Sequence, residues 1–214
     1  MFEIFDLYYK DYDKWFETKG KIIFEIEKKA FERILPYIRK PSLEIGVGSG
    51  RFAEYLKIDF GIDPSIKLLK IAKNRNIKVF KAKGENLPFK DNFFFTIFLI
   101  VTICFVDNLS EVFNEIKRVL KNGGYLVIGF VPKESPWGQL YIKKASEGHR
   151  FYKYAKFYSF QEVKKILEEN NFKIVKIIST LSQKPSDDLK YEEPSENYNK
   201  NAGFIIILSK FTKH

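Results

Sequence analysis

A short apolar segment followed by closely spaced glycines is the feature that most constrains how this chain can fold. Residues 43–45 have the composition of a buried strand, and Gly46, Gly48 and Gly50 follow at every second position. Glycine tolerates positive φ and lets a ligand approach bare main chain. The helix predicted over 52–57 would direct its unpaired N–H groups and the positive end of its dipole at this turn. The stretch therefore predicts a binding site for a ligand that carries a carboxylate or a phosphate.

The spacing of the glycines separates two classes of ligand. The dinucleotide fingerprint G-x-G-x-x-G requires a third glycine where this chain has Arg51, so an NAD-dependent oxidoreductase is the least favoured interpretation. The chain instead has E-x-G-x-G-x-G from Glu44, which resembles the first motif of class I S-adenosylmethionine (SAM)-dependent methyltransferases. The resemblance implies SAM as cofactor and S-adenosylhomocysteine as its product. It also implies that the three glycines admit the aminoacyl end of SAM, while Glu44 orients the loop or reaches the cofactor's amine.

A second short strand is predicted to end in an acid, Asp63, which lies 17 residues after Gly46. A strand–turn–helix–strand unit places a carboxylate at this distance beside the glycine loop, where it can accept hydrogen bonds from two ribose hydroxyls. The alternative is an N-cap for the helix predicted over 66–73, with Pro64 at its first position. Because Asp63 occurs together with the glycine motif, we favour the ribose role, and we place Pro64 in the same site.

Residues 82–89 and 118–126 resemble the ubiquinone/menaquinone-biosynthesis-like methyltransferases (type 11). In that family the first stretch closes over the adenine ring. The resemblance therefore implies contacts to adenine from the backbone of Gly84 and Glu85 and from the side chain of Leu87.

Two residues complete the predicted cofactor site. Val101 lies near the end of the apolar run 93–105, at the carboxyl edge of the sheet, where ligands bind in open α/β folds. Tyr12 is the candidate aromatic face for cation–π attraction to the sulfonium. The chain departs from the family at Lys83, where an acid commonly bonds the adenine amino group, and at Thr96, which is usually an aspartate.

Apolar segments alternate with helical patterns along the chain, which predicts an α/β fold with a doubly wound, mostly parallel sheet. Seven strands are expected, and by resemblance the sheet is the Rossmann-like one of methyltransferases, with the last strand inserted antiparallel. The predicted strands cover 43–45, 60–63, 77–81, 93–105, 125–131, 173–180 and 203–210. The polar stretch 182–201 is predicted to be a mobile hairpin loop. By size, residues 1–214 form a single domain.

Two segments outside the sheet are predicted to cover the ligand. Residues 1–40 join an aromatic leader to an amphipathic helix and are expected to form an N-terminal helical cap, although the aromatic side chains could simply seal that helix to the core. Residues 132–158 are a long insertion with many aromatic side chains, which is typical of a lid or a substrate pocket.

Charge and composition narrow the class of partner. The chain carries a net charge of +10, but lysines alternate with glutamates, as in 25–29 and 164–169, in the manner of solvated helix faces. Nucleic acid is therefore a possible partner, though not the favoured one. One cysteine and two histidines predict no metal site. The absence of a long apolar run and of a signal-peptide pattern predicts no membrane association and a cytoplasmic location. The abundance of Lys, Glu, Ile and Phe fits a protein of a thermophile.

Methyl transfer from a sulfonium needs alignment and desolvation more than acid–base groups, so the catalytic residue stays unknown. The one candidate is His149, as a general base or as a solvated histidine of the lid. Cys104 is interpreted as a buried free thiol. The leading hypothesis is a SAM-dependent methyltransferase that moves a methyl group to a small-molecule N, O or C acceptor by in-line displacement. The alternatives are an RNA or protein methyltransferase and a non-catalytic SAM-binding module, and the chain is expected to be a monomer or a homodimer.

Overall fold

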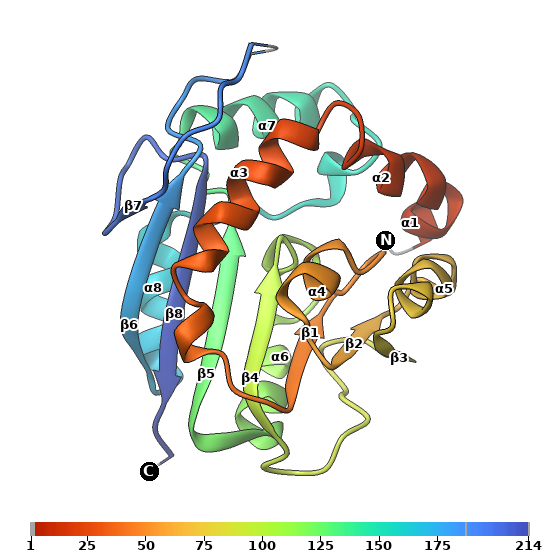
Figure 1. Cartoon of the computed structure of the whole chain (residues 1–214), viewed down its shortest axis with the longest axis vertical. Coiled ribbons are helices and arrows are strands. Elements are labelled where there is room, and N and C mark those ends of the chain that lie inside the picture. The colour runs from red at the N-terminus through yellow and green to blue at the C-terminus, as the bar shows by residue number, and fades with distance from the viewer. Residues whose placement is uncertain (1–2, 187, 214) are drawn as a thin grey trace.

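One sheet forms the middle layer of the molecule, and helices cover both of its faces (Figure 1). The computed structural model describes residues 3–186 and 188–213. The strands lie in the order β3-β2-β1-β4-β5-β8-β6-β7. Their bounds are β1 Ser42–Ile45, β2 Phe60–Asp63, β3 Lys78–Lys81, β4 Phe94–Ile100, β5 Leu120–Phe130, β6 Phe172–Thr180, β7 Ser195–Glu196 and β8 Phe204–Phe211.

The pairing of the strands confirms the predicted mostly parallel sheet. Strands β1 to β5 pair in parallel, and β8 lies antiparallel between β5 and β6. The predicted number of strands is wrong by one, because β7 adds an eighth at the edge, with Ile178 opposite Glu196 and Ser179 opposite Ser195. A strand of two residues is too short to show alternation, and it lies inside the polar stretch 182–201. Only its pairing with β6 defines it.

Alternate side chains of β4 divide between two hydrophobic cores. Ile97 and Leu99 belong to the core beneath α6 and α8, whereas Phe98 and Ile100 belong to the core beneath α3, α4 and α5. Because both faces of β4 are covered, its sequence is almost continuously apolar. The α-helices are α1 Glu3–Leu7, α2 Tyr9–Trp15, α3 Lys21–Glu32, α4 Arg51–Leu56, α5 Ile66–Asn74, α6 Leu109–Val119, α7 Pro136–Ser146 and α8 Phe160–Glu169, and the 3-10 helices are η1 Leu35–Tyr37, η2 Ile103–Phe105 and η3 Tyr152–Tyr154.

The two segments predicted as cap and lid lie together at one end of the sheet. Helices α1, α2 and α7 lie beyond the carboxyl ends of the parallel strands (Figure 1). The segment 132–158 is not an irregular loop, because it folds into α7 and η3. None of the helices in the described part of the chain is long and apolar enough to cross a membrane.

The family departure at Thr96 has a structural explanation. Thr96 is fully buried near the amino end of β4, away from the carboxyl edge of the sheet. Its Oγ accepts a hydrogen bond from the N–H of Arg39 at 2.9 Å and donates one to the carbonyl of the same residue at 2.8 Å. The hydroxyl therefore fixes the segment that leads into β1.

Candidate cofactor site and acceptor pocket

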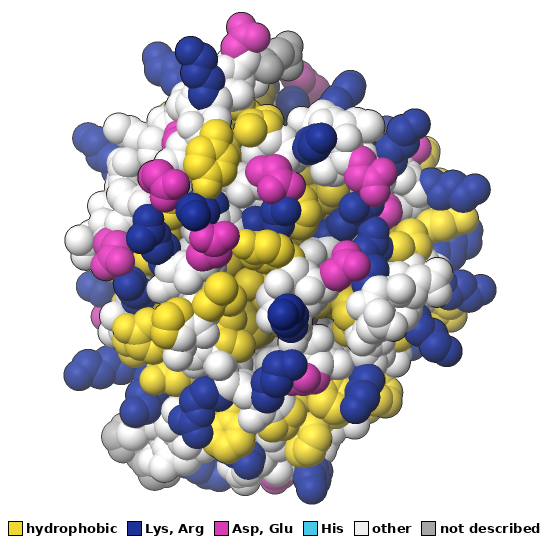
Figure 2. Space-filling model, viewed as in Figure 1, with side chains coloured by type: hydrophobic (Ala, Val, Ile, Leu, Met, Phe, Trp, Pro, Cys, Tyr) yellow, Lys and Arg dark blue, Asp and Glu magenta, His cyan; other side chains and the backbone are white. Residues whose placement is uncertain are grey.

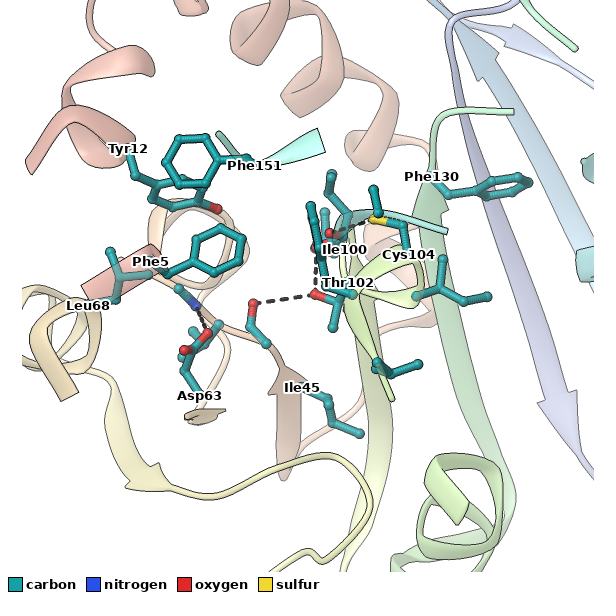
Figure 3. A pocket seen from close by; sticks show the side chains of 18 of the residues that line it. Phe5, Tyr12, Ile45, Asp63, Leu68, Ile100, Thr102, Cys104, Phe130 and Phe151 are labelled. Atoms are coloured by element: carbon teal, nitrogen blue, oxygen red, sulfur yellow. Dashed lines mark hydrogen bonds between the residues drawn. The ribbon is translucent and has the colours of Figure 1, made fainter. Parts of the chain in front are cut away.

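A cavity of about 490 Å³ lies at the carboxyl ends of β1, β2 and β4, beneath the cap and the lid. Its volume is within the usual range of ligand pockets, about 300–1,000 Å³. Figure 3 shows Asp63 on one side of this space, together with Tyr12, Phe5 and Phe151. Cys104 and Phe130 lie on the opposite side. The predicted site residues that line it are Tyr12, Glu44, Gly46, Gly48, Asp63, Pro64, Gly84, Glu85, Val101 and His149.

The glycine loop presents bare main chain to the cavity. Gly46 has φ +74°, and a Cβ at this position would lie 2.4 Å from Oγ1 of Thr102. Gly48 has φ +52°, and a Cβ there would lie 3.3 Å from the phenolic oxygen of Tyr12. A side chain at Gly46 would therefore overlap its neighbour, and both positions lie in the left-handed region that favours glycine.

Two of the predicted cofactor residues lie behind the cavity wall. Gly50 is the N-cap of α4 with φ +84°, and a Cβ there would lie 2.5 Å from Ile77 and 3.0 Å from Ala72. Leu87 is buried in the hydrophobic core, and its N–H donates to Glu115 at 2.6 Å. The cavity lining contains neither residue. Gly50 instead allows α4 to pack close to α5, and Leu87 anchors its loop from below.

Asp63 is tied to the glycine loop by its own carboxylate. Oδ2 accepts the N–H of Gly48 at 2.9 Å, and Oδ1 accepts the N–H of Ser65 at 2.8 Å. Burial raises the pKa of Asp63 to about 6. Each carboxylate oxygen has a second lone pair, so Asp63 keeps acceptor capacity for two hydroxyl groups.

The alternative reading of Asp63 as a helix cap is wrong. The N-cap of α5 is Ser65, whose Oγ accepts the N–H of Leu68 at 3.2 Å. Pro64 precedes this cap and is therefore not the first helical residue. A sequence with two candidate caps within three residues does not by itself decide which one the helix uses.

The hydrogen bonding of the Glu44 carboxyl shows whether the site is suited to SAM. Its carboxyl is buried at the end of β1, and its Oε2 has no hydrogen-bond partner within residues 3–186 and 188–213. Burial, and then the charge of Asp63, raise the pKa of Glu44. A buried oxygen without a partner is unfavourable, and the amine of a bound aminoacyl group would supply one. Glu44, the bare glycine loop and Asp63 thus match the amine, the aminoacyl chain and the ribose of SAM.

The segment that follows β3 is held against the loop that follows β4. Glu85 accepts the N–H groups of Asp107 and Asn108 at 3.0 and 3.1 Å, and Lys83 Nζ lies 2.9 Å from Oδ2 of Asp107. Asp107 lines the cavity. The family's usual acid at position 83 is thus replaced by a lysine, while an acid from the loop after β4 stands beside it. Sequence spacing gave no sign of this pairing, because the two segments are 24 residues apart.

The backbone at Val101 has an unusual conformation for a branched side chain. Val101 has φ +51° and is 38% exposed, directly after β4. Its N–H donates to the carbonyl of Gly129 at 2.8 Å, which holds it in place. Positive φ at a β-branched residue is disfavoured and is concentrated at functional sites.

Aromatic side chains from the cap and the lid meet over the cavity. Phe5 of α1 stacks on Phe151 of the lid, with ring centroids 5.1 Å apart, and contacts Tyr12 of α2 edge to face at 5.7 Å. The Arg150 guanidinium lies 2.8 Å from Oδ2 of Asp11, which adds an ion pair between the same two segments. The N-terminal helices therefore contact the segment 132–158 directly, in addition to packing on α3 through Phe16 and Phe24.

The lid also contributes a column of stacked rings to the cavity wall. His149 stacks on Tyr152 at 4.4 Å, and Tyr152 stacks on Tyr141 at 4.5 Å. His149 is half-buried, and burial, followed by the charges of Lys144 and Arg150, lowers its pKa. The imidazole is thus part of a packed aromatic wall rather than a freely solvated side chain. Burial raises the pKa of the Cys104 thiol to about 12, so this thiol is neutral.

Sequence reasoning missed Glu27, which lines the same cavity from α3. The residue is only 6% exposed, and burial raises its pKa to about 8. No other cause contributes to this pKa, and no hydrogen bond or ion pair reaches its carboxyl from the part of the chain that the structure describes. The signal was present, because Glu27 follows Ile23 by four residues and therefore shares the apolar face of the helix. The neighbouring lysines and glutamates instead made this segment resemble a solvated helix face.

Comparison with known proteins agrees with this site. Residues 43–128 match the type 11 methyltransferase family model, described as a methyltransferase domain. An uncharacterized protein of Methanocaldococcus jannaschii is 43% identical over 97% of this chain and 98% of its own length. A Thermotoga maritima crystal structure, described as a SAM-dependent methyltransferase and possible histamine N-methyltransferase, superposes with a TM-score of 0.90 at 37% identity, over 98% of this chain and 99% of that one.

A more limited similarity reaches a eukaryotic protein. Mouse probable tRNA methyltransferase 9B is 31% identical over 126 residues, which are 53% of this chain and 28% of that protein. Together with the fold and the cavity, these matches define the class: the protein is a SAM-dependent methyltransferase of class I. Within this class, the chain belongs to the type 11 family.

Proposed function

We propose that this enzyme transfers the methyl group of SAM to a small molecule enclosed between the cofactor, the cap and the lid. SAM supplies a methyl group on a sulfonium, with a neutral thioether as the leaving group. In this proposal Asp63 and Pro64 contact the ribose, Glu44 holds the amine, and the backbone of Gly46 and Gly48 faces the aminoacyl chain. The backbone of Gly84 and Glu85 borders the adenine, and Val101 and Tyr12 contact the region of the sulfonium.

The observation that carries the proposal is the closed aromatic cover. The Phe5–Phe151 stack and the Asp11–Arg150 ion pair join the cap to the lid across the cavity. A space covered from two sides excludes water and holds an acceptor in one orientation, which is what an in-line displacement requires. The description of the Thermotoga maritima relative also supports a small acceptor.

The second candidate is methylation of RNA or protein. The similarity to mouse tRNA methyltransferase 9B and the net charge of +10 favour it. Against it, Lys and Arg are scattered over the face in Figure 2 with Asp and Glu between them. Several cations at the cavity are paired with acids: Arg51 with Asp13, Lys83 with Asp107 and Arg150 with Asp11. RNA binding through free cations would weaken steeply with salt.

The cytoplasmic location, the thermophilic source and the monomeric or homodimeric state stay predictions.

Transfer of labelled methyl from SAM into a cell extract tests the proposal. After reaction, the extract is separated into small-molecule, RNA and protein fractions, with Asp63→Ala as the control protein. We expect label in the small-molecule fraction and none with the control. Label in RNA or protein would contradict the small-molecule acceptor. SAM binding without any label would indicate a non-catalytic SAM-binding module.

A further inference from the structure

The buried carboxyl of Glu27 has no role in holding the cofactor groups assigned above. Glu27 lines the cavity from α3, together with Tyr141 and Tyr152 of the lid, and Tyr141 packs against the same hydrophobic core as Ile23 and Ile26 of α3. Asp63 and Glu44 instead lie in β2 and β1, next to the glycine loop. Glu27 thus belongs to the part of the cavity left for the acceptor.

The surroundings of Glu27 are suited to one kind of ligand. The Glu27 side chain is 6% exposed, has no hydrogen bond or ion pair within the described residues, and reaches the cavity. Burying a carboxyl without a partner costs free energy, and a buried acid in a cavity is a candidate functional group. A cation would provide the missing partner. A carboxylate inside an enclosed cavity is suited to bind an ammonium group.

In the described part of the chain, none of the basic residues that line the cavity is paired with Glu27, although Lys144 Nζ lies 6.0 Å from the centroid of the Tyr141 ring. Arg150 and Lys83 have side chains 44% and 46% exposed and are paired with Asp11 and Asp107. Lys19 and Lys156 are also exposed, at the rim. Positive charge thus surrounds the mouth, whereas the carboxyl of Glu27, which burial keeps largely protonated near neutral pH in the unliganded protein, becomes negative when a cation pairs with it. An anionic acceptor would have to lie against this carboxyl.

We propose that the methyl acceptor is an amine, cationic in solution, and that the carboxyl of Glu27 binds its nitrogen inside the cavity. This inference rests on the proposed small-molecule function and specifies its substrate class. The ammonium transfers one proton to the Glu27 carboxylate, which frees the nitrogen lone pair. The nitrogen then bonds to the methyl carbon while the carbon–sulfur bond breaks, and its electron pair stays on sulfur. The products are the N-methylated ammonium and S-adenosylhomocysteine, and Glu27 afterwards returns its proton to solvent.

The test uses SAM with a trideuterated methyl group and an extract of the source cells, which is separated after the reaction into small-molecule, RNA and protein fractions. Products that carry the label are identified by mass spectrometry and sorted on a cation exchanger at neutral pH. Glu27→Gln keeps the size of the side chain but loses its charge. Glu25→Gln is the matched control, because Glu25 lies on the same helix, is exposed and pairs with Lys28. Affinity for SAM, measured by calorimetry, reports whether each variant keeps its cofactor site.

We expect the labelled product to be retained as an amine, and its formation to fall at least about tenfold in Glu27→Gln, since a charge-assisted bond is lost. Glu25→Gln should match the wild type, and all three proteins should bind SAM equally. Binding of the identified amine to the S-adenosylhomocysteine complex should weaken by a similar factor in Glu27→Gln. A neutral or acidic product, or an amine formed equally well by Glu27→Gln, would overturn this inference and leave the small-molecule function intact. Label confined to RNA or protein, or no label at all, would overturn both.

Discussion

Replacing Asp63 by alanine lowers the affinity for SAM by about 100-fold or more. Hydrogen bonds to a charged acceptor contribute about 1.5–3 kcal/mol each, and a ribose offers two hydroxyls to this carboxylate. The substitution also removes the acceptor of the Gly48 N–H, so the glycine loop loses its fixed position. Isothermal titration of SAM and S-adenosylhomocysteine measures the effect.

Asp59 offers a matched control for Asp63. It lies at the amino end of β2, where its Oδ2 accepts the N–H and the hydroxyl of Ser42, both at 2.9 Å. Asp59→Ala should therefore lower the stability of the fold without changing the affinity for SAM. An Asp63→Ala protein that is folded and binds SAM as tightly as the wild type would remove Asp63 from the cofactor site.

The unliganded protein should lose stability with rising pH, in large part through Glu27. Burial raises the pKa of Glu27 in the folded protein to about 8, above its ordinary value of 4.5. A carboxyl whose pKa is raised in the folded protein contributes stability that is fully present below about pH 4.5 and is lost as the pH rises through about 8. Within this window one such group lowers the free energy of unfolding by at most about 1.4 kcal/mol per pH unit. Urea unfolding at about pH 5, 7 and 9 measures this slope.

Glu27→Gln should flatten that dependence and be more stable than the wild type at the highest pH. Burial also raises the pKa values of Asp63 and Glu44, so some slope remains in both proteins, and the difference between them isolates Glu27. Tyr141 and Tyr152 line the same cavity as Glu27 and stay neutral across this range, because burial raises their pKa values. Parallel curves for wild type and variant would mean that Glu27 is ionised and solvated in the folded state.

That Gly46, Gly48 and Asp63 line the candidate cofactor site was predictable from sequence, because the geometry of this part of the cavity is local. Gly46, Gly48 and Asp63 act through backbone conformation and short loops, which residue type and spacing determine directly. The same sequence patterns do not show which of their residues reach the cavity, because tertiary packing decides this. Gly50 and Leu87 fit the pattern equally well, but the packing of α4 on α5 and the core beneath the loop place them behind the cavity wall.

The acceptor side depends on contacts between distant segments, which a single sequence does not specify. Glu27 of α3 and Tyr152 of the lid are 125 residues apart and line one cavity only in the folded chain. The edge strand β7 is similar, because its two residues are defined by pairing with β6 alone. Helical spacing did place Glu27 on an apolar face, and a buried acid on such a face is the signal that sequence reading can use.

A crystal structure with S-adenosylhomocysteine bound would test this description of the site. We expect the ribose hydroxyls within hydrogen-bonding distance of Asp63 and the amine of the ligand at Oε2 of Glu44. The thioether sulfur should face a remaining space bounded by Glu27, Tyr141 and Tyr152. An adenosyl group bound elsewhere, or a ligand that fills the whole cavity and leaves no space beside Glu27, would contradict it.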